Sequence, residues 1–255
     1  MTIILTELKE IPLIRQGDDL AKIIEISLHR SNLVLEDNDI LVLAQKIVSK
    51  AEGRMINLAT ITPGDRARAL AKQTDKDARL VELILQESSN VLRTRPGTII
   101  VEHKLGFICA NAGIDHSNVA GIGDANEEMV LLLPKNPDLS AKAVRSKLEK
   151  TTGKRVGVLI IDSHGRAWRN GTVGMSIGLS GIPGVLDERG WKDLFGYTLK
   201  ITIVGIADEL AAAASLLMGQ ASEGTPIVHV RGFPYRLREG TFNEMIRAKD
   251  QDLFR

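Results

Sequence analysis

Two polar segments of this 255-residue sequence carry side chains that suit a hard cation and a phosphate group. The first follows a short apolar run and consists of Asn111, Asp115, Ser117 and Asn118. The second follows the apolar run 156–161 and consists of Asp162, Ser163 and His164. Carboxylate, hydroxyl and amide oxygens are the ligands that Mg²⁺ and Mn²⁺ prefer. We therefore predict that Asp115 and Asp162 meet at a divalent-cation site, with a simple Asx-type turn as the structural alternative for the first segment.

Basic side chains that suit phosphate occur near both segments in the predicted fold. One group directly follows the apolar run 40–44 and contains Gln45, Lys46, Ser49 and Lys50, for which a solvated surface turn is the alternative. Arg166 and Arg169 follow the second acidic segment, and either can offset phosphate charge. A small polar loop at 219–224 suits the phosphates or base of a nucleotide, although a plain helix stop has the same composition.

Composition excludes several classes of protein. The formal net charge is +1 and aromatic residues make up 4% of the chain, which disfavours nucleic-acid and anionic-membrane binding. The single cysteine, Cys109, excludes an internal disulfide and suits a buried small hydrophobe in a reducing cytoplasm. No uninterrupted apolar stretch has spanning length, so we expect a cytoplasmic protein. The sequence also contains no dinucleotide fingerprint, no phosphate-loop motif and no helical histidine pair.

The hydrophobic pattern alternates between strand-like and helix-like runs and predicts an α+β fold. Strands are predicted at 3–8, 40–44, 98–101, 106–110, 129–133, 156–161, 199–206 and 227–230, with 98–110 as a hairpin. Helices are predicted after Asp18 or Asp19, within 63–92, at 141–150 between Ser140 and Gly153, at 207–218 and from about 241. A flexible loop is expected at 121–128. The glycines between 171 and 184 indicate either close backbone approach or bent edge strands.

Seven motifs, in order from Ile11 to Gly232, resemble those of the coenzyme F420:L-glutamate ligase family. They are PLIRQGDDL, VSKAEGR, NAGIDHSN, GKRVGVLIIDSHGR, WRNGTVGMSIGLSG, KDLFGYTL and ADELAAAASLLMGQASEGTPIVHVRG. The resemblance implies a GTP-dependent amide ligase that adds γ-linked L-glutamate to a deazaflavin coenzyme precursor and releases GDP and phosphate. It also implies mixed or antiparallel sheets with flanking helices, outside the Rossmann and P-loop folds, in an intertwined homodimer. Two divalent metals, Mg²⁺ or Mn²⁺, and a monovalent cation such as K⁺ are implied with it.

The same resemblance assigns roles to individual residues. The implied metal ligands are Asp115, Asp162, Ser163 and Gln220. The implied nucleotide-binding residues are Pro12, Leu13, Ile14, Arg15, Gln45, Lys46, Lys50, Asn118, Met218, Gly219, Gln220, Ala221, Ser222, Glu223, Gly224 and Thr225. Lys50 and Arg166 are the predicted catalytic residues, because their charges can stabilise a transferring phosphoryl group. We expect residues 1–255 to form one ligase unit, or two subdomains in close contact, without the carboxyl-terminal reductase-like domain of some relatives.

A free carboxylate is a poor acylating agent, which predicts how such a ligase would work. The precursor's carboxylate would attack the γ-phosphate of GTP, and the amine of glutamate would then displace phosphate from the resulting acyl phosphate. Two alternatives remain open at this point. One is a nucleotide- and metal-dependent ligase or phosphotransferase that acts on another carboxylate-bearing cofactor, and the other is a non-catalytic nucleotide-binding homologue.

Overall fold

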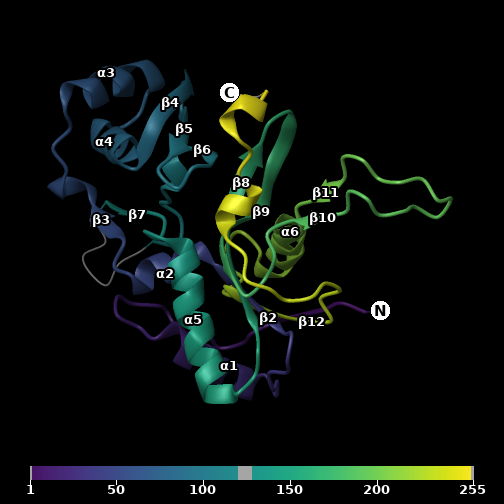
Figure 1. Ribbon diagram of the computed structural model, residues 1–255. Helices are drawn as coiled ribbons and strands as arrows, with labels where there is room; N and C mark the ends of the chain where they lie inside the picture. Colours follow the sequence, from purple (N-terminus) through teal and green to yellow (C-terminus); the bar gives the residue numbers. More distant parts are fainter. Residues whose placement is uncertain (1, 120–127, 254–255) are drawn as a thin grey trace.

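A five-stranded mixed sheet lies at the centre of the computed structural model, which describes residues 2–119 and 128–253 (Figure 1). Its strands, in spatial order, are β1 (Ile4–Glu7), β12 (Ile227–Arg231), β2 (Ile40–Ala44), β8 (Gly157–Arg166) and β9 (Arg169–Ser180). β2 and β8 run parallel, with Ile40 opposite Gly157, and every other neighbouring pair is antiparallel. The predicted α+β class is therefore confirmed, with further small sheets and flanking helices around this one.

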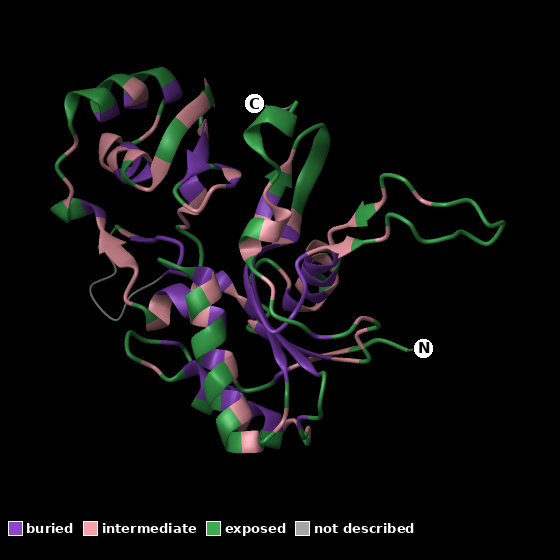
Figure 2. Ribbon diagram, in the orientation of Figure 1, coloured by how far each residue is buried: buried purple, intermediate pink, exposed green. Residues whose placement is uncertain are grey.

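The strand β2 is buried on both faces, as its uninterrupted apolar sequence predicts (Figure 2). Its alternate side chains enter two separate cores. Ile40 and Val42 pack on the side of α6 (Ile206–Met218), whereas Leu41 and Leu43 pack on the side of α1 (Leu20–Arg30) and α5 (Pro137–Thr152). The central sheet is thus covered by helices on both faces, and the carboxyl ends of the parallel strands β2 and β8 lie at the same edge.

A second group of elements stands beside the central sheet and contains α3 (Asp65–Thr74), α4 (Ala78–Gln86), β4 (Ser88–Arg95), β5 (Thr98–His103) and β6 (Ile108–Ala110). The predicted hairpin is confirmed as β5 and β6. The helical region predicted within 63–92 is confirmed as α3 and α4, but it ends before residue 92. Asp75 adopts a left-handed conformation with φ 50° that ends α3, and the residues from Ser88 onward pair with β5.

The connections differ from the predicted ones in three places. The strand predicted at 199–206 is reduced to β11 (Ile203–Val204), which pairs with β10 (Leu186–Asp187), because Ile206 already begins α6. The helix predicted from 241 is two short 3₁₀ turns, η3 (Phe242–Met245) and η4 (Lys249–Gln251), since Phe242 packs on the core instead of extending a helix. The loop predicted at 121–128 lies almost wholly outside the described residues. The remaining elements are β3 (Met55–Asn57), η1 (Leu58–Thr60), η2 (Asn111–Gly113) and β7 (Met129–Leu131).

The helix α5 and the strand β9 show how sequence details set the packing. Asn136, not Ser140, caps α5, because its side chain accepts from the Leu139 N–H at 3.1 Å; Gly153 ends the helix as predicted. The predicted close backbone approach occurs at Gly178, where a Cβ would lie 2.3 Å from the Cβ of Pro137. β9 is also the edge strand of its sheet. None of the described helices is both long and apolar enough to cross a bilayer.

Candidate active site

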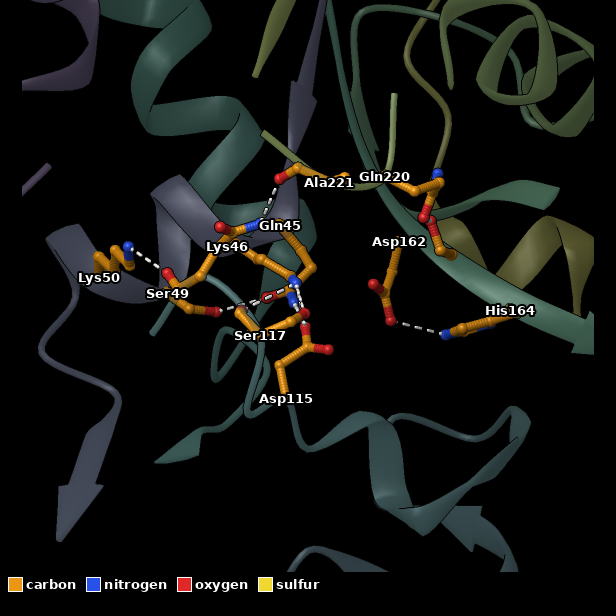
Figure 3. Close-up of polar contacts among 12 residues, drawn as sticks. Gln45, Lys46, Ser49, Lys50, Asp115, Ser117, Asp162, His164, Gln220 and Ala221 are labelled. Carbon is orange, nitrogen blue, oxygen red and sulfur yellow. Dashed lines mark hydrogen bonds and ion pairs between the residues drawn. The ribbon is translucent and has the colours of Figure 1, made fainter. Parts of the chain in front are cut away.

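The helix α2 (Gln45–Ala51) begins directly after β2 and carries four polar side chains at helical spacing. Residues four apart lie on one helix face, so Gln45 is above Ser49 and Lys46 is above Lys50. The Ser49 hydroxyl donates to Gln45 Oε1 at 2.9 Å, which leaves the Gln45 amide Nε2 to donate to Asp115 Oδ2 at 2.7 Å (Figure 3). Gln45 and Ser49 are buried, so this contact lies at the edge of the hydrophobic core.

Asp115 lies in a tight turn after β6 and is held by backbone and side chains together. Its N–H and C=O both pair with Leu131, at 3.0 and 2.9 Å. Lys46 Nζ lies 3.5 Å from Asp115 Oδ2 and donates to the Ser117 hydroxyl at 2.8 Å. Positive φ at Asn118 (56°) turns the chain back toward α2, where Lys50 Nζ donates to the Asn118 carbonyl at 2.7 Å. The turn therefore brings one carboxylate and two ammonium groups together.

The loop after α6 joins this turn from the other side. The Asn118 amide Nδ2 donates to the Ala221 carbonyl at 2.9 Å. The loop is closed on itself, because the Ala221 N–H donates to Glu223 Oε2 at 2.8 Å and the Thr225 hydroxyl donates to the carbonyls that end α6. Residues 220–224 of this loop are exposed.

Asp162 lies within the strand β8, whereas the sequence predicted it at the end of a strand. Asp162 Oδ2 is 3.0 Å from His164 Nε2, because residues two apart on a strand share a face. Ser163 points to the other face, where its hydroxyl donates to Gln220 Oε1 at 2.8 Å. Gln220 Nε2 in turn donates to the Ser215 hydroxyl at 3.3 Å. Ser163 and Gln220, predicted to share metal-binding roles, are therefore direct neighbours.

The two aspartates face one another across one space (Figure 3). Burial raises the pKa of Asp115 to about 6, with the Asp162 carboxylate adding to the rise and Lys46 and Gln45 partly opposing it. Burial lowers the pKa of Lys50, and the nearby Lys46 lowers it further. A buried carboxylate whose charge is disfavoured by a second carboxylate is suited to bind a cation. Asp115 and Asp162 thus lie on one space, and their role as metal ligands remains a prediction.

The donor set fits an oxygen-preferring cation. In the described parts of the chain, no three side chains of His, Cys, Asp or Glu gather at one point. The candidate oxygen ligands are instead the two carboxylates that face the space and, on the other face of β8, the Ser163 hydroxyl and the Gln220 amide oxygen, which contact each other. Such a set suits Mg²⁺ or Mn²⁺, which complete their coordination with water and phosphate oxygens. Cys109 is buried, as predicted, and burial followed by the Asp162 charge raises its thiol pKa to about 12.

Other predicted residues lie farther from this space. The segment Pro12–Arg15 runs close to the end of α2, since the Gly17 N–H donates to the Ala51 carbonyl, and Leu13 within it is 89% exposed. Arg166 ends β8, about 13 Å along the strand from Asp162 at roughly 3.3 Å per residue. The structure thus does not place the Arg166 guanidinium among the groups that contact Asp115 or Asp162, and its catalytic role stays a prediction.

Ser49 and His164 were among the polar residues identified from the sequence, but neither was given a specific role there. Ser49 orients Gln45, and the i, i+4 spacing on α2 was the available signal. His164 contacts Asp162, and the i, i+2 alternation would have indicated this had the strand been extended beyond residue 161.

The chain matches the family model described as F420-0:Gamma-glutamyl ligase over residues 9–232. Similar proteins named Coenzyme F420:L-glutamate ligase occur in several archaea. The one from Methanococcus maripaludis strain C6 is 47% identical over 248 residues, which cover 96% of this chain and 95% of that protein. The one from Methanothermobacter thermautotrophicus is 44% identical over 257 residues and the full length of both. The one from Methanocaldococcus jannaschii is 44% identical over 246 residues, covering 96% and 94%.

Proposed function

This chain belongs to the F420-0:gamma-glutamyl ligase family and is a ligase, and from that premise we propose that it adds L-glutamate, through γ-linkages, to the deazaflavin precursor of coenzyme F420 with GTP as the energy source. The observation that carries the proposal is the space between Asp115 and Asp162. Two carboxylates from elements 47 residues apart in the sequence face it, and the ammonium groups of Lys46 and Lys50 lie beside the turn that bears Asp115. This is an arrangement for metal-bound polyphosphate.

The residues that would hold two divalent cations are Asp115, Asp162, Ser163 and Gln220. Bound there, the cations supply positive charge that neutralises the phosphate oxygens and aligns the attacking carboxylate. Gln45 and Lys46 would keep the Asp115 carboxylate in place, since both contact its Oδ2 atom. His164 would do the same for Asp162. A site for K⁺ remains an expectation from the family resemblance.

The nucleotide would lie between α2 and the loop after α6. Asn118 already links these two parts, because it accepts from Lys50 and donates to Ala221. Pro12–Arg15 at the end of α2 and residues 218–225 would enclose the base and the phosphates. Lys46 and Lys50 would neutralise charge on the phosphates, and the lowered pKa of Lys50 reflects the burial that strengthens such contacts.

The reaction would proceed in two displacements. The precursor's terminal carboxylate attacks the γ-phosphorus of GTP, the bond to the β-phosphate oxygen breaks, and GDP leaves. The amine of L-glutamate, after losing a proton, attacks the acyl carbon, and inorganic phosphate leaves with the electron pair of the broken C–O bond. The protein's part in both steps is to hold the reacting groups in line and to keep the site electropositive around the phosphates.

We also propose that the working form is a homodimer. The segment 188–202 extends from the β10–β11 pair away from the rest of the fold (Figure 1). It displays Leu194, Phe195 and Ile201 at 97%, 95% and 88% exposure. Large apolar side chains gathered on one projecting segment indicate a contact surface, and a second copy of the chain is the partner that the family resemblance implies. Light scattering on the purified protein measures the subunit number, and a monomer would contradict this part of the proposal.

The proposed activity is tested by GDP release and product mass. The assay contains GTP, Mn²⁺ or Mg²⁺, L-glutamate and the unglutamylated precursor, and each component is left out in turn. We expect GDP release and a glutamate mass increment only with the full set. Asp162→Asn should retain the fold and lose most turnover, whereas Asp187→Asn, an exposed carboxylate on β10 paired with Arg189, serves as the matched control. Full turnover in Asp162→Asn would contradict the site, and GDP release without the precursor would contradict the acceptor.

A further inference from the structure

The hairpin of β8 and β9 is longer than the part of it that is buried in the central sheet. Residues 157–161 of β8 and 176–180 of β9 are buried, whereas Arg169–Thr172 at the other end are exposed (Figure 2). Packing holds the hairpin as far as His164, whose ring centroid lies 5.1 Å from that of Phe107, and Gly174, which lies against Ala211 and Ser215 of α6. The exposed tip lies beyond these contacts. It projects from the same strand that carries Asp162.

The tip of this hairpin displays a tryptophan in an unfavourable backbone conformation. Trp168 is 88% exposed and has φ 64°, in the left-handed region that glycine and asparagine tolerate and bulky residues avoid. A glycine or asparagine would close the same turn with less strain. Strain that is retained at an exposed aromatic residue is a signature of a functional position.

The tip is also electropositive. Arg166 and Arg169 flank Trp168, and the sequence has no aspartate or glutamate from 163 to 186. Neither guanidinium takes part in an ion pair within the described residues; Arg166 Nη1 lies 3.5 Å from the Gly171 carbonyl oxygen. An exposed indole flanked by two guanidinium groups suits a planar aromatic ligand that also carries negative charge.

The direction of β8 connects this tip to the reaction site. Asp162, His164 and Arg166 occupy alternate positions and therefore lie on one face of the strand. At about 3.3 Å per residue, Arg166 is about 13 Å and Trp168 at most about 20 Å from Asp162. One elongated molecule can therefore place a carboxylate at Asp162 and a ring system at the hairpin tip.

On the basis of this geometry, we propose that Trp168, Arg166 and Arg169 form the site that binds the planar ring of the acceptor and its nearby negative charge, while the acceptor's reacting carboxylate lies at Asp162. The inference rests on the proposed function for the identity of the acceptor, a deazaflavin. Trp168 stacks on the ring, and the arginines fix the orientation of the anionic molecule along β8. The hairpin then selects the acceptor, and the cluster around Asp115 and Asp162 handles the nucleotide.

The protein's two tryptophans, Trp168 and Trp191, make the ring site directly observable. In Trp191→Phe, Trp168 is the single indole fluorophore. Titration of this variant with the unglutamylated deazaflavin precursor, without GTP or glutamate, should quench the indole emission with saturation. The same titration of Trp168→Phe, which retains Trp191, should show much weaker quenching. Because this readout needs no turnover, it tests the ring site even if the GTP-dependent reaction is not observed.

Kinetics test the same site in the active enzyme. Trp168→Ala should raise the KM for the acceptor by about tenfold or more, as loss of an aromatic stack does at other ring-binding sites, with the KM for GTP and the saturating kcat near wild type. Trp168→Phe, which keeps a ring, should restore most of the affinity.

An acceptor KM within twofold of wild type in Trp168→Ala overturns the proposal, and so does the absence of saturable quenching in Trp191→Phe. A halved particle mass in Trp168→Ala with an unchanged KM would assign the tip to a subunit contact instead. Wild-type protein that binds the precursor with quenching but releases no GDP would refute the proposed reaction and leave the ring site supported.

Discussion

Replacing Asp115 with asparagine should stabilise the metal-free protein while it weakens cation binding. The Asp115 side chain is 27% exposed and faces the Asp162 carboxylate, so its charge is disfavoured in the folded state. Asparagine has nearly the same volume, and its amide oxygen can still accept the hydrogen bond from Gln45 Nε2. The substitution therefore removes a destabilising charge without opening a cavity.

The magnitude follows from the pKa of Asp115, which rises from 3.8 to about 6 on folding. A raised carboxyl pKa means that the contribution of Asp115 is most favourable below about pH 3.8 and declines as the pH rises to about 6. Above pH 6 the folded state is disfavoured by up to about 3 kcal/mol relative to a neutral side chain. The stability difference between Asp115→Asn and wild type should therefore be about half as large at pH 5 as at pH 7.5.

Urea unfolding and thermal unfolding in a chelator measure this difference at both pH values. At pH 7.5 we expect Asp115→Asn to be more stable than wild type, with a melting temperature higher by at most about 6–12 °C. The Asp187→Asn control, whose carboxylate is exposed and paired with Arg189, should show no such gain. Added Mn²⁺ should reverse the order, because wild type binds the cation and the variant binds it weakly. An Asp115→Asn protein that is no more stable than wild type in chelator at pH 7.5 would refute the electrostatic reasoning.

Two further predictions concern the scaffold. Gly178→Ala should destabilise the protein by about 1–3 kcal/mol or more in urea unfolding, because the added Cβ would lie 2.3 Å from Pro137. Gly165→Ala on the same hairpin is the control and should be nearly neutral, because its added Cβ meets no atom within 4 Å. Equal losses of stability in the two variants would contradict the packing at Gly178. Asp39→Asn should cost about 3–5 kcal/mol at pH 7, because the buried Asp39 carboxylate accepts from Arg231 and lies 2.8 Å from His229 Nε2. Burial disfavours the charged form of Asp39, but these contacts hold its pKa well below the usual range. The contribution of Asp39 to the stability of the fold is therefore present above about pH 4 and is lost as the pH falls below that value. The difference in unfolding free energy between Asp39→Asn and wild type should become smaller in acid. A difference that does not change with pH would argue that these contacts are not its cause.

Local patterns were enough to predict much of the framework. An uninterrupted apolar run identifies β2, because a strand buried on both faces needs no polar alternation. The turn signals around β5 and β6 identify their hairpin, and Gly153 marks the end of α5. The order of seven motifs indicated the family, which the match over residues 9–232 confirms. The prediction was wrong at 88–92, where the chain pairs with β5, and in most of 199–206, where α6 begins at Ile206. Contacts with other elements decided the conformation in both places.

The sequence by itself determined which side chains are available for chemistry: two aspartates after apolar runs, a group of amides and lysines, and a polar loop. Tertiary structure alone decided how they meet. Gln45 and Asp115 are 70 positions apart, and Asn118 and Ala221 are 103 apart, so their contacts depend on how the sheet and helices pack. It also decided that β8 continues past Asp162 to Arg166, which aligns the carboxylate with the hairpin tip. Local propensity does not encode such alignments, because they arise from burial and pairing between segments that are remote along the chain.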